Sequence, residues 1–325
     1  MDIVTDDWIY LWSGGYTHLG FFAVAIFFAL SGFLVTPGLV KNGDVIEYLS
    51  RRVMRIMPLL ILVVLVTAFG VGPLLTNRAI GAYFADPQTW LYLKNITTLL
   101  SLGLPGVADY DGGTSINDPL WSLHFEWLCY FVMAAASALG ALRNRLAFLV
   151  LWLASIVLVG FISSGDAASL GQSRLETLLL LFGFFGAGAL LHLYAGYVPT
   201  SPFLFVAAGG GLIAALAFPI THSLVAPLTA YCIVAAGLVR FPWGGLLARA
   251  DLSYGLYLMH SVVMAAVMHF AGIESWWQLF IVVWLITALC AYASWTMLEA
   301  PMLRRKSMPA QIFRALLGRG RKLLA

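Results

Sequence analysis

The sequence predicts an all-α fold, a polytopic transmembrane helical bundle with about nine spanning helices. Of the 325 residues, 61% are apolar and only 10% are charged, whereas a soluble domain carries about a quarter charged residues. The mean hydropathy is +0.91. A chain this apolar needs the lipid bilayer as the solvent for its surface.

Nine apolar stretches have the length of about 20 residues that a helix needs to cross the hydrocarbon core. They are 18–37, 54–75, 119–142, 146–163, 176–194, 202–219, 223–240, 253–271 and 276–298. Strands of a membrane barrel would instead be alternating segments of about ten residues. The longest stretch between spans, 76–118, contains Pro87, Pro105 and the Asp-Gly-Gly run at 111–113. Its apolar middle, 90–104, predicts a short helix lying on or dipping into the membrane.

The basic residues are distributed unevenly between the two sets of loops. Only Arg78, Lys94 and Arg174 fall on one side of the predicted bundle. The other fifteen are Lys41, Arg51, Arg52, Arg55, Arg143, Arg145, Arg240, Arg249, Arg304, Arg305, Lys306, Arg314, Arg319, Arg321 and Lys322. Because basic loops stay in the cytoplasm, we expect the C-terminus there and Met1 outside.

We expect one membrane domain over residues 1–301 and a basic cytoplasmic tail over residues 302–325. The tail interleaves its basic side chains with four apolar ones, Ile312, Phe313, Leu316 and Leu317. This pattern is typical of an amphipathic helix that lies on an anionic membrane surface.

Ionisable side chains are costly inside a membrane, so each is a candidate for function. Glu126 lies about seven residues into the span 119–142, hence roughly 10 Å deep. A buried carboxyl suits general acid–base chemistry, and an interhelical hydrogen bond or ion pair is the open alternative. His124, two residues away, points to another face, and we expect it to be a packing residue.

Two further candidates lie at similar depth near the cytoplasmic side. His260, in the span 253–271, is a candidate base or a ligand for a phosphate or acyl carbonyl. An interhelical hydrogen bond is equally open for it. Ser31 stands beside Gly32 in the span 18–37, and such a pair of small residues favours close packing of helices.

Three arginines, Arg51, Arg52 and Arg55, open the span 54–75 on the cytoplasmic side. Arg55 neighbours both of the others on a helical surface. Guanidinium groups at a helix N-terminus make a good phosphate site, and simple anchoring of the topology is the open alternative. Glu299, at the inner end of the last span, is expected either to pair with such an arginine or to be a solvated helix end.

Signatures of several other enzyme classes are absent. The sequence has no Gly-x-x-x-x-Gly-Lys phosphate loop, no Gly-x-Ser-x-Gly elbow and no His-Glu-x-x-His zinc helix. No histidine is followed by an aspartate five residues later, as in soluble glycerolipid acyltransferases. Cys129, Cys232 and Cys290 lie in apolar runs, so we expect small buried side chains and neither disulfides nor a metal site.

Five segments taken in order resemble acyltransferase family 3, the polytopic O-acyltransferases of bacterial envelope sugars. Residues 20–34 (GFFAVAIFFALSGFL) resemble the family's GVDLFFVLSGFL helix, and residues 51–58 (RRVMRIMP) resemble its RR..RI.P turn. Residues 117–130 (NDPLWSLHFEWLCY) resemble LWSLSVEEQFY, residues 253–260 (SYGLYLMH) resemble SYSLYLWH, and residues 298–301 (LEAP) resemble the closing E.P. The order and spacing fit from about residue 17 to residue 305, which is far more specific than any one motif.

The resemblance implies transfer of an acyl group, usually acetyl, to a hydroxyl of an envelope sugar, exopolysaccharide or lipopolysaccharide. The donor would be cytoplasmic acyl-CoA (acetyl-CoA), which is a substrate and not a bound cofactor. The implied partners are the lipid bilayer and a glycan acceptor, with no nucleic acid, and the implied location is the bacterial inner membrane. The implied catalytic residues are Glu126, His260 and Trp121, and the implied donor-binding residues are Arg52, Arg55 and Ser31, with no metal.

The sequence departs from the family pattern at its start. Family members usually begin with a further helix that carries an arginine and, about ten residues later, the histidine taken as the main catalytic base. His18 is too close to residues 27–28 to be equated with that histidine. We expect that the sequence lacks this first helix, which would bring the complete pattern to ten. Its presence upstream would also explain an outward Met1.

Two alternative functions stay open. One is a transporter or flippase of an envelope glycan intermediate, with Glu126 and His260 as a proton relay, although no inverted repeat is visible. The other is an inactive, truncated relative of the acyltransferases.

Overall fold

The computed structural model describes residues 7–101, 103–107, 115–162, 173–239, 250–273 and 275–323. Within these ranges the regular elements are all helices, and the only β contact is an isolated bridge between Thr76 and Val107. The predicted all-α fold is confirmed.

Seven helices in the described ranges are long and apolar enough to cross a membrane. They are Leu19–Lys41, Val45–Leu75, Arg145–Ile162, Arg174–Leu193, Pro219–Gly237, Ser253–Ala271 and Trp276–Arg304. The other two predicted spans are helical as well. α7 (Leu120–Ala138) is less apolar because it carries His124 and Glu126, and α10 (Pro202–Ala217) has only 16 residues. The chain is therefore a multi-pass membrane protein.

The labelled helices other than α7 and α10 have the following bounds. They are α1 (Trp8–Trp12), α2 (Leu19–Asn42), α3 (Val45–Val66), η1 (Thr67–Val71), α4 (Gly72–Leu75), α5 (Ile80–Ala85), α6 (Pro87–Leu91), η2 (Tyr92–Thr97), α8 (Arg145–Ile162), α9 (Arg174–Leu193), η4 (Pro219–Leu224), α11 (Val225–Gly237), α13 (Ser253–Ala271), α14 (Trp276–Ser294), η5 (Trp295–Glu299), α15 (Ala300–Arg304) and α16 (Met308–Leu323). The first compact unit comprises Met1–Tyr48 and Phe125–Phe241, and the second comprises Leu49–His124 and Pro242–Ala325.

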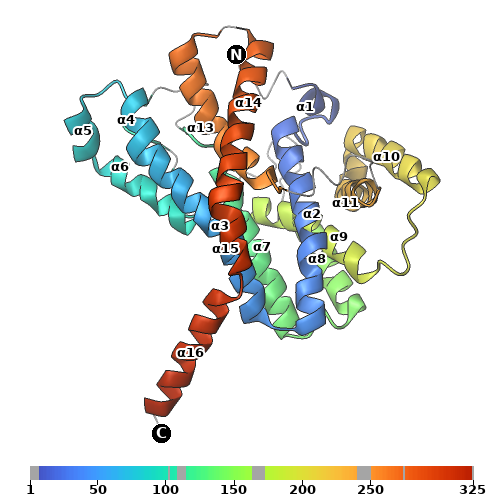
Figure 1. The fold of residues 1–325 in the computed structure, drawn as a ribbon. Coiled ribbons are helices and arrows are strands. Elements are labelled where there is room, and N and C mark those ends of the chain that lie inside the picture. Colours follow the sequence, from blue (N-terminus) through green and yellow to red (C-terminus); the bar gives the residue numbers. More distant parts are fainter. Residues whose placement is uncertain are drawn as a thin grey trace. The chain divides into compact units, whose positions relative to one another are not determined.

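In the first unit, α2 and α9 are in close contact and cross each other (Figure 1). Phe28 packs edge-on against Phe185, with ring centroids 6.4 Å apart, and further along both helices Phe33 packs against His192 at 5.6 Å.

Two glycines let α2 and α9 approach to backbone contact. A Cβ atom on Gly32 would lie 1.9 Å from the carbonyl oxygen of Phe185, and a Cβ atom on Gly188 would lie 1.9 Å from that of Ala29. Without a side chain at either position, the two helices can pack backbone against backbone. The close packing predicted at Gly32 is confirmed, and its partner on α9 is now identified.

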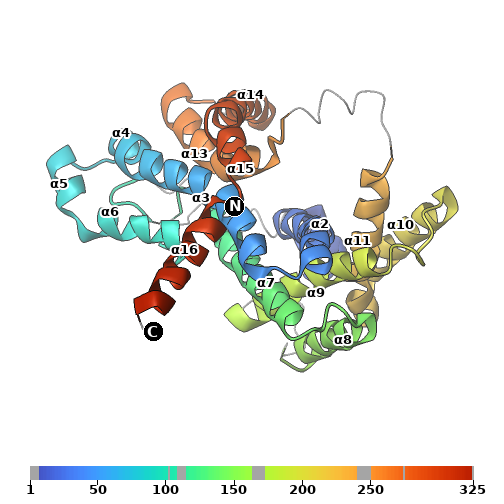
Figure 2. The same cartoon turned by 60° about the horizontal axis from the view of Figure 1, so that its bottom comes forward.

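The other helices of the first unit pack around α9. α8 runs antiparallel to it, and the indole N–H of Trp152 donates to the carbonyl oxygen of Gly183 at 2.8 Å. α11 packs on both α2 and α9, and α10 pairs with α11, as Figure 2 shows.

In the second unit, α13 and α14 form an antiparallel pair, in which Gly255 lies against Ala291. The hydroxyl of Tyr254 on α13 donates to the carbonyl oxygen of Ile56 on α3 at 3.0 Å, which fixes the start of α13 beside α3.

The stretch after α4 contains three short helices, α5, α6 and η2. The buried hydroxyl of Tyr83 donates to the carbonyl oxygen of Ala68 at 2.7 Å and so ties this stretch to η1. The short helix predicted over 90–104 is confirmed as far as Thr97. Beyond it the prediction is wrong, because Thr98 adopts a left-handed conformation with φ of 59° that ends the helix.

Candidate functional site

The carboxyl group of Glu126 is buried in the first unit and accepts hydrogen bonds from two hydroxyls. The residue is only 4% exposed. Tyr130, one turn later on α7, donates its hydroxyl to Oε1 in a hydrogen bond. Ser31 of α2 donates to the same oxygen at 3.5 Å, the long end of the hydrogen-bonding range. A buried carboxyl needs such donors, because an unpaired buried charge is strongly destabilising.

Aromatic rings fix the position of the Tyr130 hydroxyl. The ring of Tyr130 packs edge-on against Phe185 of α9 at 5.9 Å and against Tyr48 of α3 at 6.2 Å. Ser31 is fixed in turn, because the adjacent Gly32 is in backbone contact with α9. A carboxyl held this way in a water-poor site can take a proton from an alcohol and return it.

Arg55, in the second unit, is held by two carboxylates and two aromatic rings. Its guanidinium donates to Asp251 at 2.6 Å and to Glu299 at 3.3 Å. It also lies over the rings of Tyr254 and Trp295, 5.6 and 5.7 Å from their centroids. The predicted pairing of Glu299 with an arginine is confirmed, and Glu299 is only 1% exposed.

The two carboxylates around Arg55 differ in exposure and therefore in role. Glu299 also accepts a hydrogen bond from the hydroxyl of Ser294 at 3.0 Å, so it is a fixed, buried partner. The side chain of Asp251 is 52% exposed, so an anion from solution can compete with it. The site carries one positive and two negative charges, and a phosphate that binds Arg55 has to displace Asp251.

The expectation that the arginines sit at a helix N-terminus is wrong. α3 begins at Val45, so Arg51, Arg52 and Arg55 lie in its second and third turns. The field of a helix N-terminus acts within the first turn and does not contribute here. Any anion at this cluster would be held by the guanidinium groups themselves.

His260 is exposed on α13, one turn after Tyr257, which contacts the start of α7 in the second unit. Its Nδ1 lies 2.8 Å from the carbonyl oxygen of Tyr257. Since a carbonyl only accepts, this nitrogen carries the proton and Nε2 is the basic nitrogen. The hydroxyl of Tyr257 lies 2.6 Å from that of Ser122, and the amide of Asn117 donates to the carbonyl oxygen of Leu258 at 3.1 Å.

The structure gives the exposure and contacts of the other predicted site residues. Arg52 and Trp121 are both half-buried in the second unit. His124, expected to be a packing residue, is half-buried as well. Ser31, which the family resemblance implies as a donor-binding residue, contacts Glu126 through its hydroxyl.

His18, whose role the sequence leaves open, caps the N-terminus of α2. Its Nδ1 accepts a hydrogen bond from the backbone N–H of Phe21 at 3.3 Å. Burial lowers the pKa of His18, and the nearby charge of Asp7 opposes this only in part. Burial tends to raise the pKa of Asp7, but hydrogen bonds from the backbone N–H groups of Leu19, Ile9 and Tyr10 and the charge of His18 together lower it below its usual value.

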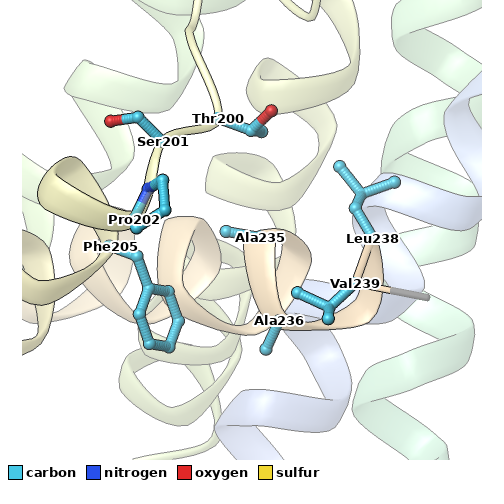
Figure 3. Close-up of a pocket in the computed structure, with 8 residues that line it drawn as sticks. All are labelled: Thr200, Ser201, Pro202, Phe205, Ala235, Ala236, Leu238 and Val239. Carbon is cyan, nitrogen blue, oxygen red and sulfur yellow. The ribbon is translucent and has the colours of Figure 1, made fainter. Parts of the chain in front are cut away.

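A cavity of about 490 Å³ in the first unit lies between the start of α10 and the end of α11 (Figure 3). It is lined by Thr200, Ser201, Pro202, Phe205, Ala235, Ala236, Leu238 and Val239. The lining residues that the structure describes carry no ionisable side chain. In the part of the chain that the structure describes, no three His, Cys, Asp or Glu side chains form a group able to hold a metal ion.

Comparison with known proteins gives the class of the chain. The family model described as an acyltransferase domain matches residues 3–295. The chain belongs to acyltransferase family 3. As a member of this family, it is a membrane enzyme that transfers acyl groups.

Two relatives of this acyltransferase carry informative names. Over 153 residues it is 30% identical to a protein of Shigella phage Sf6 named O-acetyl transferase, covering 46% of the chain and 44% of that protein. The match therefore spans less than half of the phage protein. Over 310 residues it is 26% identical to Nodulation protein 10 of Rhizobium leguminosarum bv. viciae, covering 87% of the chain and 82% of that protein. No solved structure matches the chain significantly.

The structure of this acyltransferase also identifies site residues that the sequence analysis missed. Tyr130 has a sequence signal, since it is four residues after Glu126 and hence on the same helical face. Asp251 has none, because it is 196 residues from Arg55 and only the fold brings them together. The same holds for Tyr257 and Ser122, which are 135 residues apart.

Proposed function

We propose that this acyltransferase moves an acetyl group from acetyl-CoA to a hydroxyl of an envelope sugar, in an exopolysaccharide or lipopolysaccharide. The observation that carries the proposal is the buried carboxyl of Glu126 with its two hydroxyl partners. The name of the phage relative supports an O-linked acetyl group as the product.

The reaction needs one proton to be moved. The acceptor hydroxyl oxygen attacks the thioester carbonyl carbon, a C–O bond forms, and the C–S bond breaks. Glu126 takes the hydroxyl proton as general base and then gives it to the departing thiolate of coenzyme A. His260 is the second candidate base, because its basic Nε2 is set by the hydrogen bond at Nδ1; Trp121 stays a proposed site residue by resemblance.

Arg52 and Arg55 are the proposed contacts for the phosphates of the donor. A planar guanidinium matches phosphate oxygens in a bidentate manner. The location we propose is the bacterial inner membrane with the C-terminus in the cytoplasm, which is supported by the fifteen basic residues on one side of the predicted topology. Cytoplasmic acetyl-CoA then meets the same face as these arginines.

The test is incubation of membranes that contain the protein with acetyl-CoA labelled in the acetyl group. The proposal expects label in the glycan fraction that mild alkali releases, as it does an ester. Movement of a glycan across the membrane with no label transferred would instead establish the transporter alternative. Label on amines, stable to mild alkali, would overturn transfer to a hydroxyl.

The choice of variants follows from the packing. Arg55→Ala would leave the buried Glu299 without its cation, which costs about 3–5 kcal/mol. Loss of activity would then report instability. Arg55→Lys keeps the charge near Glu299 while removing the planar fork, so it should raise the KM for acetyl-CoA and leave the protein folded.

A further inference from the structure

α16 exposes apolar side chains that no other part of the second unit covers in the structure described. Ile312, Phe313 and Leu316 are 49%, 49% and 60% exposed. At 100° per residue these three positions share one arc of the helix, and Arg314 lies on the other side. The expected helical tail is thus confirmed, and Figure 1 shows α16 continuing beyond α15 as a separate helix.

The charge around α16 is of one sign. Between Glu299 and Ala325 the sequence has no acidic residue. The basic residues of this segment are Arg304, Arg305, Lys306, Arg314, Arg319, Arg321 and Lys322. An apolar arc on a helix whose charged residues are all basic matches a bilayer surface with anionic headgroups, where the apolar arc enters the acyl boundary and the basic side chains meet the headgroup phosphates.

A single hydroxyl joins the first turn of α16 to α3. The Oγ of Ser50 donates to the carbonyl oxygen of Lys306 at 2.7 Å and accepts from the backbone N–H of Ala310 at 3.1 Å. Ser50 and Ala310 are 4% and 1% exposed. Ser50 directly precedes Arg51 and Arg52 on α3, so the position of α16 is tied to the arginine cluster.

We propose that α16 binds the anionic lipid surface of the membrane and that Ser50 couples this contact to α3. The ligand is a headgroup phosphate in a bilayer and not a soluble anion, because the exposed apolar arc needs an acyl layer to cover it. Lipid binding stands without the proposed acetyl transfer, and it is measured without any substrate.

The experiment uses the full chain in nanodiscs of phosphatidylcholine with or without added phosphatidylglycerol, and it follows amide hydrogen exchange over residues 308–323. We expect anionic lipid to slow this exchange about tenfold or more, since each basic residue adds to the attraction. Salt should weaken the effect by screening. Arg314→Gln combined with Arg319→Gln, Arg321→Gln and Lys322→Gln should abolish it, whereas the control Lys94→Gln, on the other side of the predicted topology, should leave it intact.

Two further outcomes decide the proposal. If Ser50 couples the two helices, anionic lipid should also slow amide exchange in α3 of the wild-type protein. Ser50→Ala should keep the slowing in α16 and remove the slowing in α3. A Ser50→Ala protein in which anionic lipid slows exchange in α3 as in wild type would overturn the coupling. Equal exchange of α16 in both nanodiscs, or equal slowing by free inorganic phosphate, would overturn lipid binding. Slowing that appears only when a soluble protein fraction is added would assign the face to a protein partner instead.

Discussion

Replacement of Gly32 by alanine should separate α2 from α9 and damage the Glu126 site with a single methyl group. The added Cβ would lie 1.9 Å from the carbonyl oxygen of Phe185, and an ordinary contact begins near 3.4 Å, so the helices must move apart by about 1.5 Å. The obstacle is backbone, which cannot rotate away as a flexible side chain would.

The cost follows from the kind of clash. Overpacking a closely packed interface costs about 1–3 kcal/mol, and a backbone obstacle puts Gly32→Ala near the upper end. For a chain of this size we expect the unfolding temperature in detergent to fall by about 3–5 °C. Ser31, next to Gly32, would lose its hydrogen bond to Glu126, which at 3.5 Å has no distance to spare.

The assay compares thermal unfolding and acetyl transfer in Gly32→Ala and in a matched control, Gly210→Ala on α10. A Cβ atom on Gly210 meets nothing within 4 Å, so the control removes a helix glycine without a clash. It should be neutral or more stable by about 0.5–1 kcal/mol. Equal unfolding temperatures for the two variants would refute backbone contact between α2 and α9.

Three further predictions test the individual groups. Tyr130→Phe removes one of the donors to Glu126 and should lower kcat about 10–100-fold, since a hydrogen bond to a charged group contributes about 1.5–3 kcal/mol; a kcat within twofold of wild type in transfer assays would rule out this role. Asp251→Asn should lower the KM for acetyl-CoA about two- to fivefold, as expected for removing a half-exposed competitor for Arg55, and a raised KM would contradict this. Because burial lowers the pKa of His18 in the folded state, the unfolded state binds its proton more tightly, so the stability of the α2 start is full above about pH 6.5 and falls as the pH drops towards the lowered value. Hydrogen exchange there, corrected for its intrinsic rate, should accelerate as the pH falls below about 6.5, and His18→Asn should remove this dependence because its amide caps the helix without titrating.

The sequence predicts the spanning helices well because burial in lipid leaves a continuous apolar signal. The predicted start of the second span, residue 54, is wrong for a related reason, because α3 begins at Val45. Residues 45–53 include Glu47, Ser50, Arg51 and Arg52, so they are too polar to count as a span, although they are helical. Apolarity marks the lipid-facing part of a helix and says little about where its helical hydrogen bonding begins.

The candidate site is only partly visible in the sequence. Glu126 stands out because a carboxylate in an apolar run is rare, and Gly32 stands out because Ser-Gly pairs favour close packing. Other contact residues do not stand out: Gly188 lies among other small residues of α9, and Asp251, the partner of Arg55, lies in a largely apolar stretch between two spans. Long-range pairing of this kind depends on how helices cross, which the local pattern of one sequence does not record.

The most direct test of the account is acetyl transfer by Glu126→Gln, which keeps the shape of the side chain and removes its ability to take up a proton. We expect this variant to unfold at nearly the wild-type temperature and to lose at least about 100-fold in transfer rate, the contribution of a general base. A folded Glu126→Gln protein that acetylates its acceptor at the wild-type rate would contradict the proposed mechanism.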